Sequence, residues 1–192
     1  MNTIVSKRFF SENVAEIVVE APLIARSRKA GHFVIVRVDK NGERMPLTIS
    51  DADLEQGTIT LVVQRIGVSS SKLCALEAGD YVADLVGPLG KATDIRNFGT
   101  VVCACGGVGA APMLPIAQAL KAAGNRVITV LAARNRELII LHDQLAAVSD
   151  EVIVMTDDGS MGQKGLVTEG VEQVINREQV DKCVTIGRAI MM

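Results

Sequence analysis

The feature that most constrains the fold is a change of hydrophobic rhythm after Gly87-Pro88-Leu89-Gly90. Before this point, apolar and polar residues alternate in short runs separated by turn residues, which is the period-two pattern of half-buried strands. After it, apolar runs are continuous and are separated by stretches with helical spacing, which is typical of βαβ units around a parallel sheet. We therefore predict two domains: an antiparallel β-barrel or sandwich over residues 1–96 and a parallel α/β domain over residues 97–192.

The same patterns predict the individual elements. Strands of the first domain are expected at Ile4–Phe9, Ala15–Glu20, Phe33–Asp39, Pro46–Ser50, Thr58–Gln64 and Tyr81–Leu85. One helix, Ser70–Leu76, is expected to have Ser69 or Ser70 as its N-cap. In the second domain, strands and helices are expected to alternate through Thr100–Cys105, Pro112–Ala123, Arg126–Ala132, Arg136–Val148, Glu151–Thr156, Val167–Ile175 and Lys182–Ile186.

Composition excludes several classes of protein. The 192 residues carry a formal net charge of −2 and are 48% hydrophobic, so the chain can form a core and lacks the basic surface of a nucleic-acid binder. No apolar run approaches the ~20 residues that span a bilayer, which argues against a membrane protein. The polar, alternating start does not resemble a signal peptide. Because four cysteines occur without a signal sequence, we expect a cytoplasmic location.

A glycine-rich turn, Gly106-Gly107-Val108-Gly109-Ala110-Ala111-Pro112, lies between a buried strand and a helix. Glycines let the backbone approach a phosphate closely, and the free N–H groups at a helix start attract its charge. The pattern differs from G-x-G-x-x-G, the ordinary dinucleotide fingerprint. A tight turn without a ligand is the alternative, but the strand–turn–helix context favours phosphate binding.

Three further segments contain residue types suited to anions. The segment Arg44-Met45-Pro46-Leu47-Thr48 offers a guanidinium whose fork of donors fits a diphosphate. Taken without the other motifs, this pattern indicates only a solvated arginine at the edge of a sheet. Gly67-Val68-Ser69-Ser70-Ser71-Lys72 places hydroxyls at a helix start, either as an anion site or as a cap. Residues 156–162 come at the carboxyl end of a parallel strand, which is the edge where open α/β sheets bind ligands. They are therefore either a ligand-binding loop or a glycine turn with solvated acidic side chains.

The sequence predicts neither a metal site nor a catalytic side chain. Cys103 and Cys105 share one face of a strand, Cys74 and Cys183 are distant in sequence, and no C-x-x-C pair occurs. Both histidines stand alone, and the motifs contain no Ser–His–Asp-like or paired-carboxylate set.

The ordered motifs together resemble the ferredoxin-NADP reductase-like flavoprotein superfamily. The resemblance rests on RMPLTIS (44–50), GPLG (87–90), GGVGAAP (106–112), DDGSMGQKGLV (157–167) and GRAIMM (187–192) and covers essentially the whole chain. Within the superfamily, the chain is most similar to the small subunits of NADH-dependent ferredoxin:NADP oxidoreductase, also labelled sulfide dehydrogenase. The electron-transfer subunits of dihydroorotate dehydrogenase are near relatives.

The resemblance implies a function. It implies hydride transfer from NAD(H) or NADP(H) to FAD, followed by electron transfer to an iron–sulfur partner such as ferredoxin or to a larger catalytic subunit. The chain would then work in a hetero-oligomer. The alternatives are an electron-transfer subunit of dihydroorotate dehydrogenase in pyrimidine biosynthesis, a non-catalytic nucleotide-binding subunit, and a structural subunit.

The resemblance also implies binding residues. FAD would be held in the barrel domain by Arg44, Pro46, Leu47, Thr48, Val62, Val63, Gln64, Gly67, Ser69 and Ser70. The nicotinamide dinucleotide would be held in the α/β domain by Gly106, Gly107, Gly109, Pro112, Arg134, Asp157, Asp158 and Gly159. The choice between cofactors stays open, because Arg134 suits a 2′-phosphate whereas Asp157 or Asp158 suits a free ribose hydroxyl.

One departure from the family concerns the end of the sequence. Family members carry a cysteine-rich segment that binds a [2Fe-2S] cluster after a G-P-x-x-M-M stretch, whereas Arg188 stands at the proline position here and Met192 is the last residue. We therefore expect a chain without the cluster ligands and without the last helix of its parallel sheet. A partner or further sequence is expected to cover that face.

Overall fold

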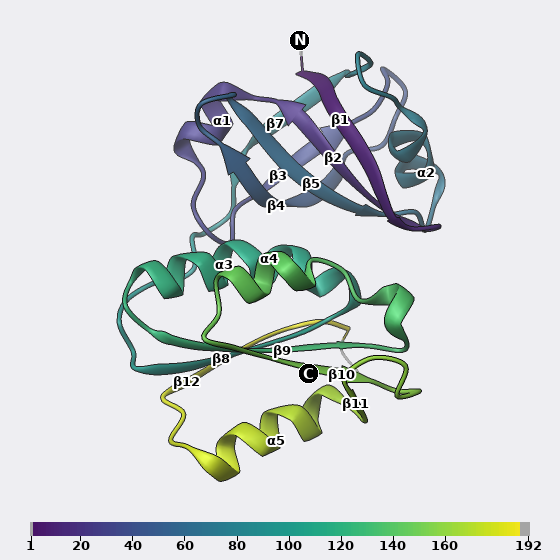
Figure 1. Cartoon of the computed structure of the whole chain (residues 1–192). Helices are drawn as coiled ribbons and strands as arrows, with labels where there is room; N and C mark the ends of the chain where they lie inside the picture. The colour runs from purple at the N-terminus through teal and green to yellow at the C-terminus, as the bar shows by residue number, and fades with distance from the viewer. Residues whose placement is uncertain (1, 189–192) are drawn as a thin grey trace. The chain divides into compact units, whose positions relative to one another are not determined.

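The computed structural model describes residues 2–188. Contacts between residues divide the chain into two compact units, residues 1–93 and 94–192, which are described separately below (Figure 1). The division falls three residues before the boundary expected from sequence. Residues 190–192, where the sequence suggests a missing helix, lie outside the described part of the chain.

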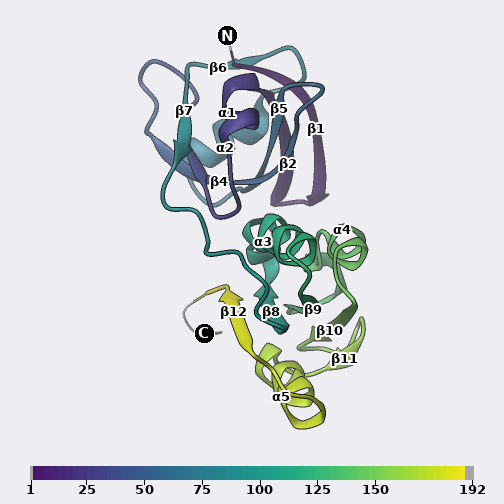
Figure 2. The same cartoon turned by 90° about the vertical axis from the view of Figure 1, so that its left-hand side faces the viewer.

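The first unit is a seven-stranded antiparallel sheet with the order β6-β1-β2-β5-β4-β3-β7, and it curls toward a barrel (Figure 2). This architecture confirms the predicted fold class of the first half. The strands are β1 (Asn2–Ser11), β2 (Val14–Glu20), β3 (Phe33–Arg37), β4 (Met45–Asp53), β5 (Thr58–Gln64), β6 (Tyr81–Val82) and β7 (Asp84–Leu89). The helices are α1 (Pro22–Ser27) and α2 (Val68–Ala75).

Alternation along the strands builds the core of this unit. Ile17 and Val19 of β2 and Ile59, Leu61 and Val63 of β5 are at most 1% exposed, while the residues between them face away. Burying one such side chain contributes about 1.5–3 kcal/mol before the entropy of ordering is subtracted. The inward residues therefore fix the register, because a slip of one residue would expose all of them.

Several local predictions for this unit are wrong. The single strand expected at Tyr81–Leu85 is two strands: β6 pairs with β1, and β7 pairs with β3. Helix α1 was not expected, although Pro22 at its first position is a common helix start. The N-cap of α2 is Gly67, not Ser69 or Ser70, and Ser70 lies at the third helical position.

The second unit is a parallel sheet with the order β11-β10-β9-β8-β12, as predicted for the second half. The strands are β8 (Thr100–Gly106), β9 (Arg126–Ala133), β10 (Glu151–Thr156), β11 (Gln163–Lys164) and β12 (Lys182–Ile186). Helices α3 (Ala110–Ala122) and α4 (His142–Ala147) lie on one face and α5 (Val167–Arg177) on the other (Figure 1). Among the described residues, no helix is long and apolar enough to cross a membrane.

The helix predicted over Arg136–Val148 is wrong in its first half. Residues Arg136–Leu138 form a 3-10 turn, in which the Asn135 side chain accepts a hydrogen bond from the Leu138 N–H. Helix α4 begins only at His142. Leu141, between the two, has a φ of 57°, which an α-helix does not allow. The short strand β11 was also not predicted, since two residues carry no periodicity.

Candidate functional site

The predicted flavin-binding residues of β4 and β5 divide between the two faces of the sheet. Leu47 packs against the hydrophobic core, and Val63 is part of that core. Pro46 and Thr48 alternate with Leu47 on β4 and therefore face outward. Because Ile49 pairs with Leu61, continuing the register by one residue places Thr48 opposite Val62.

The outward residues therefore lie on one surface of the sheet, at the start of β4 and the end of β5. They are Pro46, Thr48, Val62 and Gln64, with Arg44 directly before β4, and Val62 among them is only 7% exposed. On this surface Leu47 and Val63 offer only backbone groups, because their side chains point into the core.

Arg44 brings a positive charge to this surface. Its side chain is 56% exposed, and its guanidinium lies 3.3 Å from Asp84 at the start of β7. The same Asp84 oxygen lies 2.6 Å from the guanidinium of Arg37 on β3. Asp84 is thus shared by two arginines, of which Arg44 is the more exposed and the more distant.

The start of α2 offers main-chain donors. The first helical bond runs from the Ser71 N–H to the Gly67 carbonyl, so the N–H groups of Val68, Ser69 and Ser70 point out of the helix end. The Ser70 hydroxyl stays local, since it accepts from the N–H groups of Ile66 and Gly67 at 3.0 Å each. Nothing lies within 4 Å of a Cβ built on Gly67, whose φ of −136° suits any residue. Its lack of a side chain therefore has no local structural cause, and it leaves the helix end open.

Side chains tie the segment before β4 to this helix. The Ser69 hydroxyl donates to Glu43 at 3.0 Å, and the Lys72 ammonium donates to Asp39 at 2.8 Å. The bond from Lys72, supported by the Asn41 N–H, holds the pKa of Asp39 below its usual value. The structure therefore brings Ser69 next to Glu43, the residue that precedes Arg44.

In the second unit, the glycine-rich turn lies where the strand order reverses. The chain leaves β8 toward β9 on one side, while β12 lies on the other side. Ligands of open α/β sheets bind at such switch points, outside the carboxyl ends of the strands. A Cβ on Gly109 would lie 2.5 Å from the Ile186 carbonyl oxygen, so the turn packs directly against the end of β12. Gly107 has a φ of 54°, a left-handed conformation that glycine adopts without strain.

The loops after β9 and β10 lie side by side at the same sheet edge. The N–H groups of Asp157 and Asp158 donate to the carbonyls of Ala133 and Arg134 at 3.1 and 3.3 Å. Arg134, Asp157 and Asp158 are all exposed, and hydrogen bonds from Ser160 lower the pKa of Asp158. The predicted dinucleotide residues are therefore gathered at one edge: Gly106, Gly107, Gly109 and Pro112 after β8, Arg134 after β9, and Asp157, Asp158 and Gly159 after β10.

The cysteines are placed as ordinary core or strand residues. Burial raises the pKa of Cys103 to about 12, so its thiol stays protonated near neutral pH, and Cys105 is shifted in the same direction. Among residues 2–188, no group of three or more His, Cys, Asp or Glu side chains could hold a metal ion.

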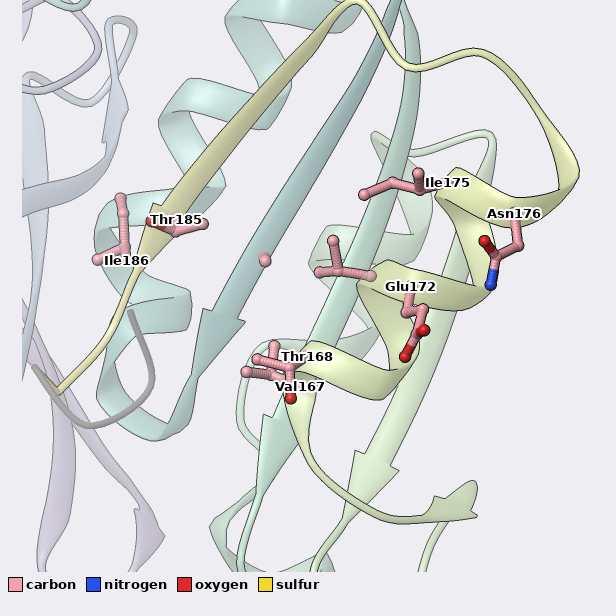
Figure 3. Close-up of a pocket in the computed structure, with 9 residues that line it drawn as sticks. Val167, Thr168, Glu172, Ile175, Asn176, Thr185 and Ile186 are labelled. Atoms are coloured by element: carbon pink, nitrogen blue, oxygen red, sulfur yellow. The ribbon is translucent and has the colours of Figure 1, made fainter.

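A separate groove of about 400 Å³ lies between α5 and the sheet (Figure 3). Helix α5 lines it with Val167, Val171 and Ile175, and β8 and β12 line it with Ala104 and Thr185. The groove contains none of the predicted binding residues.

Sequence reasoning assigned Glu43, Asp84 and Ile186 no role at these sites, and it singled out Ser160 only as part of the segment 156–162. Ser160 accepts a hydrogen bond from the Arg136 N–H at 2.8 Å and so joins two loops of the sheet edge. It stands within the DDGS motif, which was a usable signal. Asp84 and Ile186 carry no such signal, because their partners are distant in sequence.

Comparison with known proteins supports a family assignment, although no protein-family model matches the chain. The chain is 40% identical over 192 residues to the dihydroorotate dehydrogenase B (NAD(+)) electron transfer subunit homolog of Thermotoga maritima, covering 100% of this chain and 68% of that protein. It superposes on a structure of the NADH-dependent reduced ferredoxin-NADP oxidoreductase with a TM-score of 0.94 and 38% identity, covering 100% of this chain and 69% of that one.

A more distant likeness shows the fold alone. A ferredoxin NADP+ reductase from Neisseria gonorrhoeae with bound FAD and NADP aligns with a TM-score of 0.76 and 18% identity over 99% of this chain and 85% of that one. With the two-unit architecture and the ordered motifs, these relationships identify the chain as a member of the ferredoxin-NADP reductase-like superfamily of flavoprotein oxidoreductases, in its group of electron-transfer subunits.

Proposed function

We propose that this chain is an FAD-containing subunit that takes electrons from a nicotinamide dinucleotide and passes them to an iron–sulfur partner. One observation carries the proposal: each unit has its own site suited to a diphosphate. The first unit has Arg44, whose chain neighbour Glu43 accepts a hydrogen bond from Ser69 at the open start of α2, and the second has the glycine turn at the switch point of a parallel sheet. A protein that only senses a nucleotide needs one such site.

The first unit fits FAD. The Arg44 guanidinium and the N–H groups at the start of α2 are donors for the diphosphate, and the absence of a side chain at Gly67 leaves room for it. Thr48, Val62 and Gln64, on the outward face of adjacent strands, would lie against the flavin ring. Bound there, FAD would supply an acceptor for the two electrons and the proton of a hydride.

The second unit fits NAD(H) or NADP(H). The backbone of Gly107 to Gly109 and the start of α3 would hold its diphosphate, with Pro112 in the first turn of the helix. Arg134 and the pair Asp157 and Asp158 would meet the adenosine end. Because the arginine suits the 2′-phosphate of NADPH and the aspartates suit the free ribose hydroxyl of NADH, we propose both dinucleotides as candidate substrates.

The chain's own contribution is binding and orientation rather than acid–base chemistry. A hydride moves as a unit between the two cofactors, so the transfer itself needs no proton donor from the protein. We therefore assign no catalytic side chain.

The electron acceptor in this proposal is a partner protein. The cysteines of the described residues do not fit an iron–sulfur cluster, because Cys103 and Cys105 are buried and no ligand group of three forms. The relative from Thermotoga maritima is named as an electron transfer subunit homolog, which supports a hetero-oligomer here as well. Two acceptors are proposed: a ferredoxin-type iron–sulfur protein and the larger subunit of a dihydroorotate dehydrogenase.

Reconstitution tests the proposal. Purified chain is incubated with excess FAD, freed of unbound flavin, and titrated with NADH and NADPH by calorimetry. One tightly held FAD per chain together with binding of either dinucleotide is expected. Dinucleotide binding without any retained flavin would contradict the proposal and support a non-catalytic nucleotide-binding subunit instead.

A further inference from the structure

In the structure, carboxylates contact the groups proposed to hold the FAD diphosphate. Arg44 is paired with Asp84 at 3.3 Å, and the Ser69 hydroxyl donates to Glu43 at 3.0 Å. These two carboxylates come from different segments, the loop before β4 and the start of β7. Each carboxylate contacts the donor group that a phosphate oxygen would bind, namely the Arg44 guanidinium or the Ser69 hydroxyl.

We propose that Glu43 and Asp84 are internal competitors of the FAD diphosphate, so that flavin binding is an exchange of carboxylate for phosphate at Arg44 and Ser69. The inference rests on the proposed function, since it concerns the same site. It assigns a role to two residues outside the predicted binding set, namely setting how tightly the protein binds the cofactor.

The charges explain why an exchange is needed. A diphosphate is an anion, and so are Glu43 and Asp84, so the three cannot share Arg44 and Ser69 without repulsion. Glu43 is exposed and has room to swing away, because its neighbours Lys40 and Asn41 are exposed loop residues. Its departure frees the Ser69 hydroxyl beside the main-chain donors of α2.

Asp84 is placed to release Arg44 without becoming unpaired. The oxygen that contacts Arg44 lies closer, at 2.6 Å, to the guanidinium of Arg37. Arg37 also donates to the Lys40 carbonyl at 3.0 Å, which holds it in place. When Arg44 turns to a diphosphate, Asp84 therefore keeps one cationic partner and stays in place.

The test compares the affinity of flavin-free protein for FAD in matched variants by flavin fluorescence at fixed ionic strength. Glu43→Gln removes the competing charge and keeps the side-chain shape. Glu55→Gln removes the same charge from an exposed turn of the same unit, at the other end of β4, which is about 30 Å long at ~3.3 Å per residue. We expect Glu43→Gln to bind FAD about twofold to fivefold more tightly than the natural chain, with Glu55→Gln unchanged.

Asp84→Asn is the second variant. It also frees Arg44, but it removes a charged partner from Arg37, so we expect tighter FAD binding together with a lower melting temperature of the flavin-free protein. The Glu43→Gln protein should melt at the temperature of the natural chain, since Glu43 is exposed.

Each other outcome overturns the inference in an identifiable way. If the natural chain binds FAD and Glu43→Gln binds it equally or more weakly, the competition is refuted while the proposed function stands. If Glu55→Gln tightens binding as much as Glu43→Gln, the effect is one of net charge and the assignment to Glu43 fails. If neither the natural chain nor any variant binds FAD, the proposed function itself is wrong, and the inference falls with it.

Discussion

The two proposed anion sites of this protein are built in different ways. In the first unit the proposed site adds charged and hydroxyl side chains, Arg44 and Ser69, to the main-chain donors at the start of α2, with open space around Gly67. In the second unit the site depends on the main chain, because Gly109 lies against the Ile186 carbonyl and leaves no room for a Cβ. The first site should therefore be sensitive to changes of charge, and the second to changes of volume.

Arg44→Ala should give the largest effect and should affect one site only. Loss of a charge-assisted hydrogen bond costs about 1.5–3 kcal/mol, which corresponds to about a tenfold to a hundredfold weaker FAD affinity. Arg134→Ala serves as the matched control, since it removes an exposed arginine from the second unit. Fluorescence and calorimetric titrations should show weaker FAD binding for the first variant and weaker dinucleotide binding for the second. An unchanged FAD affinity in Arg44→Ala would reject its role at the diphosphate.

Gly109→Ala tests the dependence on volume. The added Cβ would lie 2.5 Å from a backbone oxygen, so the turn or the end of β12 must move. Such overpacking typically costs about 1–3 kcal/mol, and thermal unfolding should show that loss in the second unit even without ligand. Dinucleotide affinity should fall as well, whereas FAD affinity should not change. A variant as stable as the natural chain would contradict the close packing at the switch point.

Gly67→Ala is the same substitution at the other site and should behave differently. Its Cβ meets no atom within 4 Å and its backbone is extended, so unfolding of the flavin-free protein should be nearly unchanged. FAD binding should weaken, because the methyl group takes space beside the proposed diphosphate. If the two glycine substitutions lowered the melting temperature of the flavin-free protein equally, the proposed distinction between the sites would be wrong.

Acidification should lower the thermal stability of both units slightly, and over the same pH range. Hydrogen bonds from Lys72 and Lys121 lower the folded-state pKa of Asp39 in the first unit and of Asp150 in the second. Because these pKa values are lowered, the stabilisation is present above the unfolded value near 4 and is lost as the pH falls below it. Both carboxyls are close to solvent, so Asp39→Asn and Asp150→Asn should each lower the melting temperature at pH 7 by no more than roughly a few degrees. The difference from the natural chain should shrink as the pH falls from 4 through the lowered folded-state pKa values, and a difference that does not change with pH would rule out the ionised pair as its cause.

The comparison between the units also shows what the sequence could predict. The bounds of Thr58–Gln64, Glu151–Thr156 and Lys182–Ile186 were predicted correctly because apolar periodicity and flanking turn residues mark each of them. The helix expected at Arg136–Val148 failed because Leu141 takes a left-handed conformation that no local pattern announces. Helix α1 was missed because a single turn carries little periodicity.

The same limit applied to the sites. The glycine turn was recognisable because strand, turn and helix are contiguous in sequence. The contact between Glu43 and Ser69 was not, since 26 positions separate the two residues and only the fold brings them together. Likewise, the pattern of the sequence could not tell that Leu47 and Val63 face the core, whereas Thr48 and Val62 face outward.

The most direct test of the central claim is an anaerobic titration with NADH, and then NADPH, of protein loaded with FAD, followed through the visible flavin band. The account predicts that at least one dinucleotide bleaches the band with one equivalent per flavin, because a hydride carries the two electrons that reduce it. A protein that binds FAD and both dinucleotides, yet keeps its flavin oxidised, would contradict the proposed electron transfer.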